Sequence, residues 1–516
     1  MHIYSNPVDM KKIILFAAVL FAASTSAIAG GYFQNTNQSI AFIRMPAQNA
    51  AIGVQAAYFN PAGIGFLDNG WHLEAGWQMP TQRRYITSDY APFAYGADHA
   101  GSSVVKYTGK TFVPFLPTLS AAYVHDKLFA SFHFGAITGG GACNFDDGLG
   151  SFEAPIAALA GVFNILGGAM GKAPGAYAAD IHFTGKQYNL AGQLMVGYKI
   201  TDNLSISAGV RMNHIFNDYD GAIENVTFNG KSFGATIQSY GLPAPVGDMV
   251  DNMVQMKIKA HNDCNAFNPI IGVDYKTGKL NFSARYEFRT AVRLKNSSDN
   301  EVPDMAVAAA YDPSKNPTVR ADIPASLSLG VQYEIIPGLR TELDWNYYFD
   351  KQANVFGGND DSGAALNKQE RLGGNPWEIA LGAEYDINEK WTVSAGANNL
   401  NLNLGEGKAY ISDTDFSTSS VTVCIGGRYR FSKKVAVDFG YYKAFYANWT
   451  KNYSDYSGLS SMAGTMGGML ENLAKKYPAL APAVAQIGAQ MATGIPATVK
   501  YDRDSRLVGI GVVLDF

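Results

Sequence analysis

The chain is poor in charge and, beyond its amino terminus, lacks long apolar runs. Only 16% of its 516 residues are charged and the formal net charge is -4, so there is no electrostatic case for binding nucleic acid. A helical membrane protein would be far more hydrophobic, and no stretch after the amino terminus predicts a membrane-spanning helix. The composition instead suits strands that are apolar on one face and polar on the other.

Cysteine is scarce as well. Cys143, Cys264 and Cys424 are the only three, and their spacing fits no metal site. An odd number in an exported protein leaves at least one thiol unpaired. Cys143 and Cys264 fall in predicted outer loops, where they either pair or remain buried free thiols.

Motifs of enzymes are also missing. His133, His182 and His214 stand alone, no Gly-x-Ser-x-Gly lies on a strand-to-helix turn, and no His-Glu-x-x-His occurs. The chain has no nucleotide-binding motif, which leaves it without an energy source of its own. We predict a protein that is not an enzyme and that binds neither metal nor cofactor.

What the chain does contain is strand-like alternation that runs to its last residue. In the segment 507–516, apolar Val508, Ile510, Val512, Leu514 and Phe516 alternate with small or polar residues. Similar segments of about ten residues recur upstream, as expected when one face meets lipid and the other a lumen. This pattern is typical of a β-barrel in a bacterial outer membrane.

The amino terminus agrees with export. Two lysines precede the apolar run 13–23, and Ala27-Ile28-Ala29 forms a small-x-small cleavage site. Residues 1–29 therefore read as a signal peptide, and translation could begin at either Met1 or Met10.

Short turns and long connections alternate along the rest of the chain. The turns join six pairs of strands, and with an opening strand from Trp71 and the closing strand to Phe516 the number is about fourteen, even as bacterial barrels require. We expect the barrel to occupy residues 70–516, to be monomeric, and to have both chain ends in the periplasm. The turns are at 125–127, 201–203, 276–279, 336–338, 387–390 and 432–434; the long connections are near 85–113, 139–185, 218–264, 293–320, 350–374, 402–417 and 448–500.

Inward positions carry charges of both signs. In the strand predicted for 280–292, Arg285, Glu287 and Arg289 share the lumenal face, and a one-residue slip would place the arginines in hydrocarbon at about 2 to 4 kcal/mol each. Arg211 and the pair Arg428 and Arg430 are inward on the same reasoning. A guanidinium in a partly dry cavity can bind a ligand carboxylate, or it can pair with an inward acid, and both readings stay open.

Residues 30–69 precede the first strand and have no lipid-facing alternation. They contain Asn60-Pro61-Ala62, a few dozen residues after Gly30-Gly31-Tyr32-Phe33. On these residues the chain resembles the FadL-type family of outer-membrane transporters for long-chain fatty acids and other hydrophobic compounds. Leu190–Arg211 and Ile323–Leu327 add further similarity.

The resemblance implies that residues 30–69 form a helical hatch inside the barrel, with Asn60-Pro61-Ala62 against an inward kink in the third strand. Phe33 belongs to the same gate. The third strand is 128–137, where Gly135 is the best candidate for the break because glycine often marks a strand bulge. The kink would leave a lateral opening for an apolar ligand, although Asn-Pro is also an ordinary turn starter.

Two outer loops are too apolar to be only solvated. In 152–170 one helical face is apolar, and 462–491 is similar but broken at Pro478 and Pro482. Such helices either pack as a lid with its own core or line a groove that receives ligand. The face in the first loop comprises Phe152, Ile156, Leu159, Phe163 and Leu166.

Together with the barrel pattern, the resemblance implies passive outer-membrane transport of hydrophobic compounds, with long-chain fatty acids as ligands, through a hatch-gated barrel with a lateral exit. The expected partners are the ligand, outer-membrane lipid and the barrel-assembly machinery. The alternatives are uptake of aromatic hydrocarbons by the same architecture, a general porin, or a structural surface barrel whose loops serve adhesion.

Overall fold

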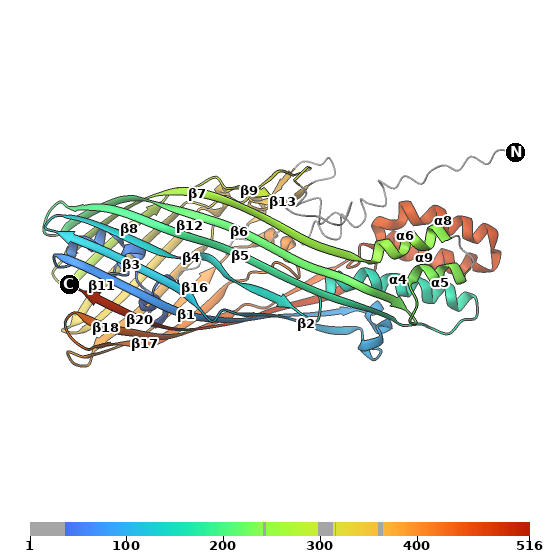
Figure 1. The fold of residues 1–516 in the computed structure, drawn as a ribbon, viewed down its shortest axis with the longest axis horizontal. Helices are drawn as coiled ribbons and strands as arrows, with labels where there is room; N and C mark the ends of the chain where they lie inside the picture. The colour runs from blue at the N-terminus through green and yellow to red at the C-terminus, as the bar shows by residue number, and fades with distance from the viewer. Residues whose placement is uncertain (1–36, 241–243, 298–312, 315, 360–364) are drawn as a thin grey trace.

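The computed structural model describes residues 37–240, 244–297, 313–314, 316–359 and 365–516. Within them the chain forms a closed antiparallel β-barrel of fourteen strands (Figure 1). This confirms the predicted fold class. The signal peptide, both possible starts and Phe33 lie outside the described residues.

Four of the fourteen wall strands are interrupted, so each of these carries two labels. The wall consists of β1 (Gly70–Tyr90), β2 (Val104–Phe112) with β3 (Leu116–His125), β4 (Leu128–Phe145), β5 (Tyr177–Lys199), β6 (Leu204–Phe228), β7 (Met256–Thr277), β8 (Leu280–Glu287) with β9 (Arg293–Asn296), β10 (Thr318–Arg320) with β11 (Ser326–Ile336), β12 (Leu339–Tyr348), β15 (Trp377–Asp386), β16 (Trp391–Asn401), β17 (Ser420–Arg430), β18 (Val435–Tyr446) with β19 (Trp449–Tyr453), and β20 (Ala497–Asp515). A separate small sheet pairs β13 (Phe356–Asn359) with β14 (Ala365–Asn367).

The barrel closes where its first strand meets its last. β1 and β20 pair without a register shift from His72 opposite Asp515 to Tyr90 opposite Ala497. The alternation read at the carboxyl terminus places Val508, Ile510 and Val512 on the outer surface, where each is more than 40% exposed. An outward apolar row with a buried inner row is what a wall between lipid and lumen requires.

The two ends of the barrel differ in their connections. All six predicted tight turns lie at one end, which also holds the carboxyl terminus and is called the turn end here (Figure 1). Helices gather at the opposite, loop end.

Several strands continue far beyond the lengths expected from the sequence. β5, β6 and β7 have 23, 25 and 22 residues, whereas about 9–11 residues suffice to cross an outer membrane. The predicted loops 139–185 and 218–264 are therefore wrong at their edges. The outer positions in this extension are polar and exposed, as at His182, Asp220 and Lys257, so the apolar alternation stops before the sheet does.

The helices at the loop end form a compact cap. They are α4 (Gly150–Ala169), α5 (Phe233–Ser239), α6 (Ala244–Val254), α8 (Ala463–Lys476) and α9 (Ala481–Thr493), with the short 3-10 helices η2 (Ala91–Tyr95), η3 (Ala97–His99), η7 (Leu459–Met462) and η8 (Pro478–Leu480). α4 covers the first predicted apolar loop, and α8 and α9 cover the second. Pro482 lies in the first turn of α9 and does not break it. The helices α5 and α6 were not predicted.

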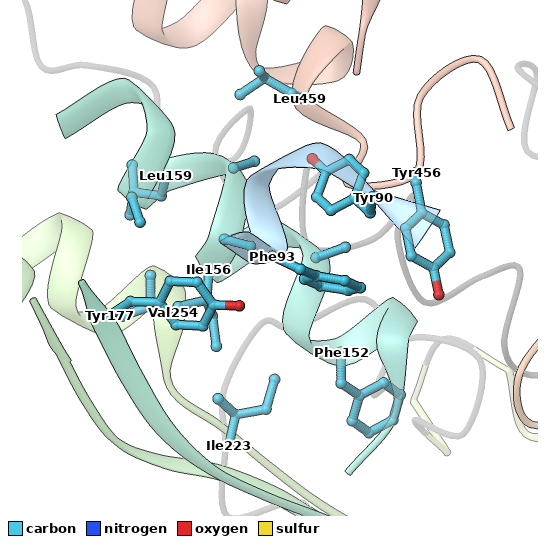
Figure 2. Packing of buried hydrophobic residues seen from close by; sticks show 14 of the residues in the cluster. Tyr90, Phe93, Phe152, Ile156, Leu159, Tyr177, Ile223, Val254, Tyr456 and Leu459 are labelled. Atoms are coloured by element: carbon cyan, nitrogen blue, oxygen red, sulfur yellow. The ribbon is translucent and has the colours of Figure 1, made fainter. Parts of the chain in front are cut away.

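The apolar face of α4 is the centre of the cap core. Phe152, Ile156, Leu159, Phe163 and Leu166 are each at most 7% exposed. Figure 2 shows three of them among aromatic side chains of η2, the strand ends and the loop before η7. Of the two readings of this loop, the structure contains a lid with its own core. By length and composition α4 could cross a membrane, contrary to the sequence analysis, but most of it is buried in this core.

One buried carboxylate ties the cap to the strands beneath it. Glu153 on α4 accepts hydrogen bonds from Tyr107 Oη at 2.6 Å and Tyr177 Oη at 2.7 Å, and its Oε1 lies 3.1 Å from His99 Nε2. The hydrogen bond to Glu153 raises the pKa of His99 above its usual range, against the opposing effect of burial. Burial would raise the pKa of Glu153, but its hydrogen bonds with His99, Tyr107 and Tyr177 together hold that pKa below its usual range.

We therefore expect the cap to loosen with alkali. A histidine with a raised folded pKa stabilises the fold fully below its unfolded pKa of about 6.5 and loses that contribution as pH rises through the folded pKa. Hydrogen exchange of α4 amides should thus speed up beyond the intrinsic rate as the pH rises above about 6.5. In His99→Gln this excess should vanish, whereas His125→Gln, at the exposed last residue of β3, should retain it. An excess unchanged in His99→Gln would assign the pH response to another group.

Candidate functional site

Hatch

The described part of the predicted hatch, residues 37–69, fills the lumen towards the turn end. It contains α2 (Ile40–Arg44), α3 (Ala56–Phe59) and the 3-10 helix η1 (Pro61–Phe66). Apart from a few residues, it is buried by the surrounding strands. It lies between two cavities of about 290 and 370 Å³, the first lined by Asn37 and the second by Arg44, Ile52 and Gln55.

Carboxylates on β12 hold the middle of the hatch by its backbone. Asp344 Oδ2 accepts from the backbone N–H groups of Gln48 and Asn49 at 2.7 and 2.9 Å, and Glu342 Oε1 accepts from Ala50 N at 2.6 Å. Three successive amides thus find acceptors on the barrel wall. Buried amides need such partners because no water satisfies them there.

Strand glycines let the hatch backbone approach the wall. A Cβ on Gly330 would come within 2.6 Å of Ala50 N, and one on Gly440 within 2.8 Å of Arg44 N. Any larger residue at either position would push the hatch inwards. The wall is therefore shaped to receive this segment.

Two of the predicted ligand arginines anchor the hatch instead. Arg211 Nη1 and Nη2 donate to the two carboxylate oxygens of Glu287 at 2.6 and 2.9 Å. Arg285 donates to the carbonyl oxygen of Tyr58 in the hatch and lies 3.4 Å from Glu287. Both guanidinium groups lie near the ring of Tyr58, at 4.9 and 5.1 Å from its centroid. Arg285 thus holds the hatch by a hydrogen bond, whereas Arg211 is bonded to Glu287 and Gln193 on the wall and contacts the hatch through the ring of Tyr58.

The other inward arginines of the sequence analysis also have partners. Arg428 makes a bidentate pair with Asp438 at 2.6 and 2.8 Å, and Arg430 donates to Thr392 at 2.8 Å. The prediction that Arg289 faces the lumen is wrong. β8 ends at Glu287, and Arg289 is exposed and donates to the carbonyl of Gln352. It does not face the lumen because the strand that would set its direction has already ended.

Asn60-Pro61-Ala62 begins η1. Asn60 accepts from Gly63 N at 3.3 Å as the N-cap and donates to Asp274 on β7, while Pro61 occupies the first turn. The hydrogen bond to the kinked part of β4 comes instead from Gln38, which donates to the Ala136 carbonyl at 2.8 Å. η1 itself also contacts β4.

Broken wall

The wall is interrupted on one side of β4. Its ladder with β3 ends at Phe134 opposite Leu119, and its pairing with β2 is confined to Asn144 opposite Lys110. Bulges against β5 fall between Ala136 and Thr138 and between Gly139 and Gly141. Gly135, the predicted break, is thus the first residue beyond the β3 ladder.

The 290 Å³ cavity lies directly behind this interruption. Its lining includes Thr138 and the glycines 139–141 of the bulged segment, with apolar Leu116 and Phe145 beside them. On the outer surface, Phe112 and Phe115 next to the break are 65% and 61% exposed. The break therefore lies between a cavity in the lumen and an apolar outer surface. The cap residues predicted to bind ligand do not line this cavity.

The structure also shows the state of the three cysteines and whether metal-binding side chains gather. Cys143, Cys264 and Cys424 are all free, and Cys143 lines the cavity. In the described part of the chain no group of three or more His, Cys, Asp and Glu side chains could hold a metal ion.

The pairing around Glu287 predicts how the hatch can be loosened. Glu287→Gln leaves Arg211 and Arg285 without their buried carboxylate, and breaking such a pair costs about 3–5 kcal/mol. We expect higher single-channel conductance in planar bilayers, because the hatch is released while the wall ladders stay intact. The control is Glu378→Gln, whose partners Tyr348, Asn346 and Asn398 all lie on the wall. Equal conductance of both variants would contradict an anchoring role for Glu287.

Relatives

Comparisons with known proteins agree with this architecture. Residues 182–493 match the family model described as outer membrane protein transport protein (OMPP1/FadL/TodX). No curated protein matches the chain.

Among solved structures, a Pseudomonas aeruginosa FadL homologue matches at 14% identity with a TM-score of 0.56, covering 94% of this chain and 99% of that one. The Ralstonia pickettii toluene transporter TbuX matches at 14% identity with a TM-score of 0.50, covering 94% and 100%. The P. putida toluene transporter TodX matches at 15% identity with a TM-score of 0.50, covering 90% and 94%. At such identities these structures establish the fold alone.

Since the family model covers more than half of a chain that folds as a fourteen-stranded barrel around a hatch, this protein belongs to the OMPP1/FadL/TodX family of outer-membrane transport proteins for hydrophobic compounds.

Proposed function

We propose that the protein takes up long-chain fatty acids by passive diffusion and releases them sideways through the interruption in β4. The observation that carries this proposal is the 290 Å³ cavity behind residues 135–143, which have no ladder partner on their β3 side until Asn144. Elsewhere a wall strand must pair its backbone on both sides, because lipid offers no hydrogen bonds.

The surroundings of the break suit a molecule that leaves towards lipid. The ring centroids of Phe115 and Trp77, two outward aromatic residues, lie 6.2 Å apart. The outer surface beside the break is therefore apolar. Inside, the cavity has both apolar and polar lining. An amphiphile with a long tail fits such a lining better than a purely polar solute would.

The two ends of the barrel set the direction of transport. The turn end, with the carboxyl terminus, is the periplasmic side and the cap faces outwards, as short turns and long loops are arranged in bacterial barrels. The hatch closes the route to the periplasm below the cavity, so an apolar ligand has its free path through the wall. No covalent chemistry is involved, and the protein acts as a monomer folded by the barrel-assembly machinery.

Sealing the break should stop uptake. Val113 lies across it, and a Cβ on Gly141 would come within 2.6 Å of a Val113 methyl group. We expect Val113→Cys with Gly141→Cys, made in a Cys143→Ser background, to form a disulfide that reduces oleate uptake by cells to the level without the protein. Reduction of the disulfide should restore uptake.

The matched control joins residues that are already paired. Ala121→Cys with Phe132→Cys links β3 to β4 within their ladder and should leave uptake unchanged. Full uptake through the sealed break would overturn the lateral exit. Uptake of toluene but not oleate by the unsealed protein would replace fatty acids with aromatic hydrocarbons, and steady conductance without selective uptake would favour a porin.

A further inference from the structure

Two arginines that line the cavity behind the break take no part in the contacts described above. Arg84 on β1 and Arg503 on β20 are direct register partners across the closing seam of the barrel. Both line the 290 Å³ cavity. Like charges directly opposite each other destabilise a sheet, so their juxtaposition needs a reason.

Neither arginine has a carboxylate partner within the described residues. Arg84 Nε donates to Gln82 at 3.0 Å, and its guanidinium lies 5.5 Å from the Phe416 ring centroid. Arg503 lies 4.4 Å from the ring centroid of Tyr446, and its buried Nε has no acceptor. A ring face occupies one side of a guanidinium but leaves its N–H edge available.

The nearest acids are engaged elsewhere. Asp415 lines the same cavity, but the ammonium of Lys368 lies 3.4 Å from it. Asp504, the next residue after Arg503, pairs instead with Lys443 and Arg506. Asp415 thus acts on Arg84 and Arg503 only through space, and no carboxylate in the described residues forms an ion pair with either guanidinium.

The lack of a bonded carboxylate distinguishes Arg84 and Arg503 from other arginines of the lumen. Arg211 and Arg428 each make a bidentate bond to a carboxylate of the wall. A cation that is half-buried without such a bond loses hydration that nothing replaces. An anion delivered by a ligand would replace it.

We infer that Arg84 and Arg503 bind the carboxylate of an amphiphilic ligand and so make the channel select acids over neutral hydrocarbons. The assignment rests on the proposed function, because it needs an apolar ligand in this cavity. Carboxylates accept two parallel hydrogen bonds from one guanidinium, and two guanidinium groups can share one headgroup. The acyl chain extends along the apolar lining, which includes Leu116, Phe145, Leu400 and Leu402.

A thiol already present in the cavity reports on the ligand. Cys143 lines the cavity and is partly exposed, so a bound ligand should slow its alkylation by a maleimide. Mass spectrometry of the full chain in detergent would locate the label, which separates Cys143 from the other two thiols. Oleate and oleyl alcohol serve as probes, since they differ only in the headgroup.

We expect oleate to protect Cys143 at lower concentration than oleyl alcohol does. Arg503→Gln and Arg84→Gln should each weaken protection by oleate about 10- to 100-fold, the effect of losing a hydrogen bond to a charged group. Protection by oleyl alcohol should not change, which also shows that the variants are folded. The control is Arg83→Gln, because Arg83 is the exposed neighbour of Arg84 and does not line the cavity.

Different results would contradict the carboxylate site and the uptake proposal. If both probes protect Cys143 equally and the arginine variants change nothing, the carboxylate site is wrong while the uptake proposal stands. If neither probe protects Cys143 in the parent protein, the cavity takes no long-chain ligand and both proposals fall.

Discussion

The continuous ladder between β1 and β20 is the interaction on which the rest of this structure depends. It closes the sheet from His72 to Tyr90, and only a closed sheet leaves no unpaired backbone edge in hydrocarbon. Closure also defines a lumen whose inner face must be filled, which the hatch does with backbone bonds to Asp344 and Glu342. The unpaired side of β4 is then exceptional. It is tolerated because bulges turn that segment away from regular pairing and because a cavity rather than a packed core lies behind it.

Hatch and wall are complementary in both charge and shape. Tyr58 lies near Arg211 and Arg285, which share the single carboxylate of Glu287, while glycines such as Gly440 let the hatch backbone approach the wall. A buried ion pair of this kind is weak evidence for stability, since desolvation offsets much of its attraction. Its value here is positional. Without the hatch, Arg211 and Arg285 would lose their contacts with Tyr58 and, with Glu287, would face an unfilled lumen. These contacts give the hatch one strongly preferred position.

Sequence reasoning reached the repeated, local features and missed those created by closure. The alternation in 280–287 and the tight turns predicted strand number and lumenal faces, because side-chain period and turn chemistry are local properties. The long extensions of β5 to β7 escaped because their outer positions are polar, as at Lys257 and Lys259. Arg289 was assigned inwards by extending the alternation past the last residue of β8. Arg84 and Arg503 are more than four hundred positions apart in the chain, and only the register of the closing seam makes them neighbours.

The seam also explains why such a charged pair persists beside the break. Opposed guanidinium groups weaken the ladder that closes the barrel, whereas Ser505 and Ser88 on the same two strands are neutral and buried. A sequence selected for stability alone would place a neutral residue there. Local conflicts of this kind concentrate at functional positions. An anion bound between β1 and β20 would thus strengthen the closing ladder while its apolar tail lies behind the break in β4, so that recognition and exit occupy one cavity.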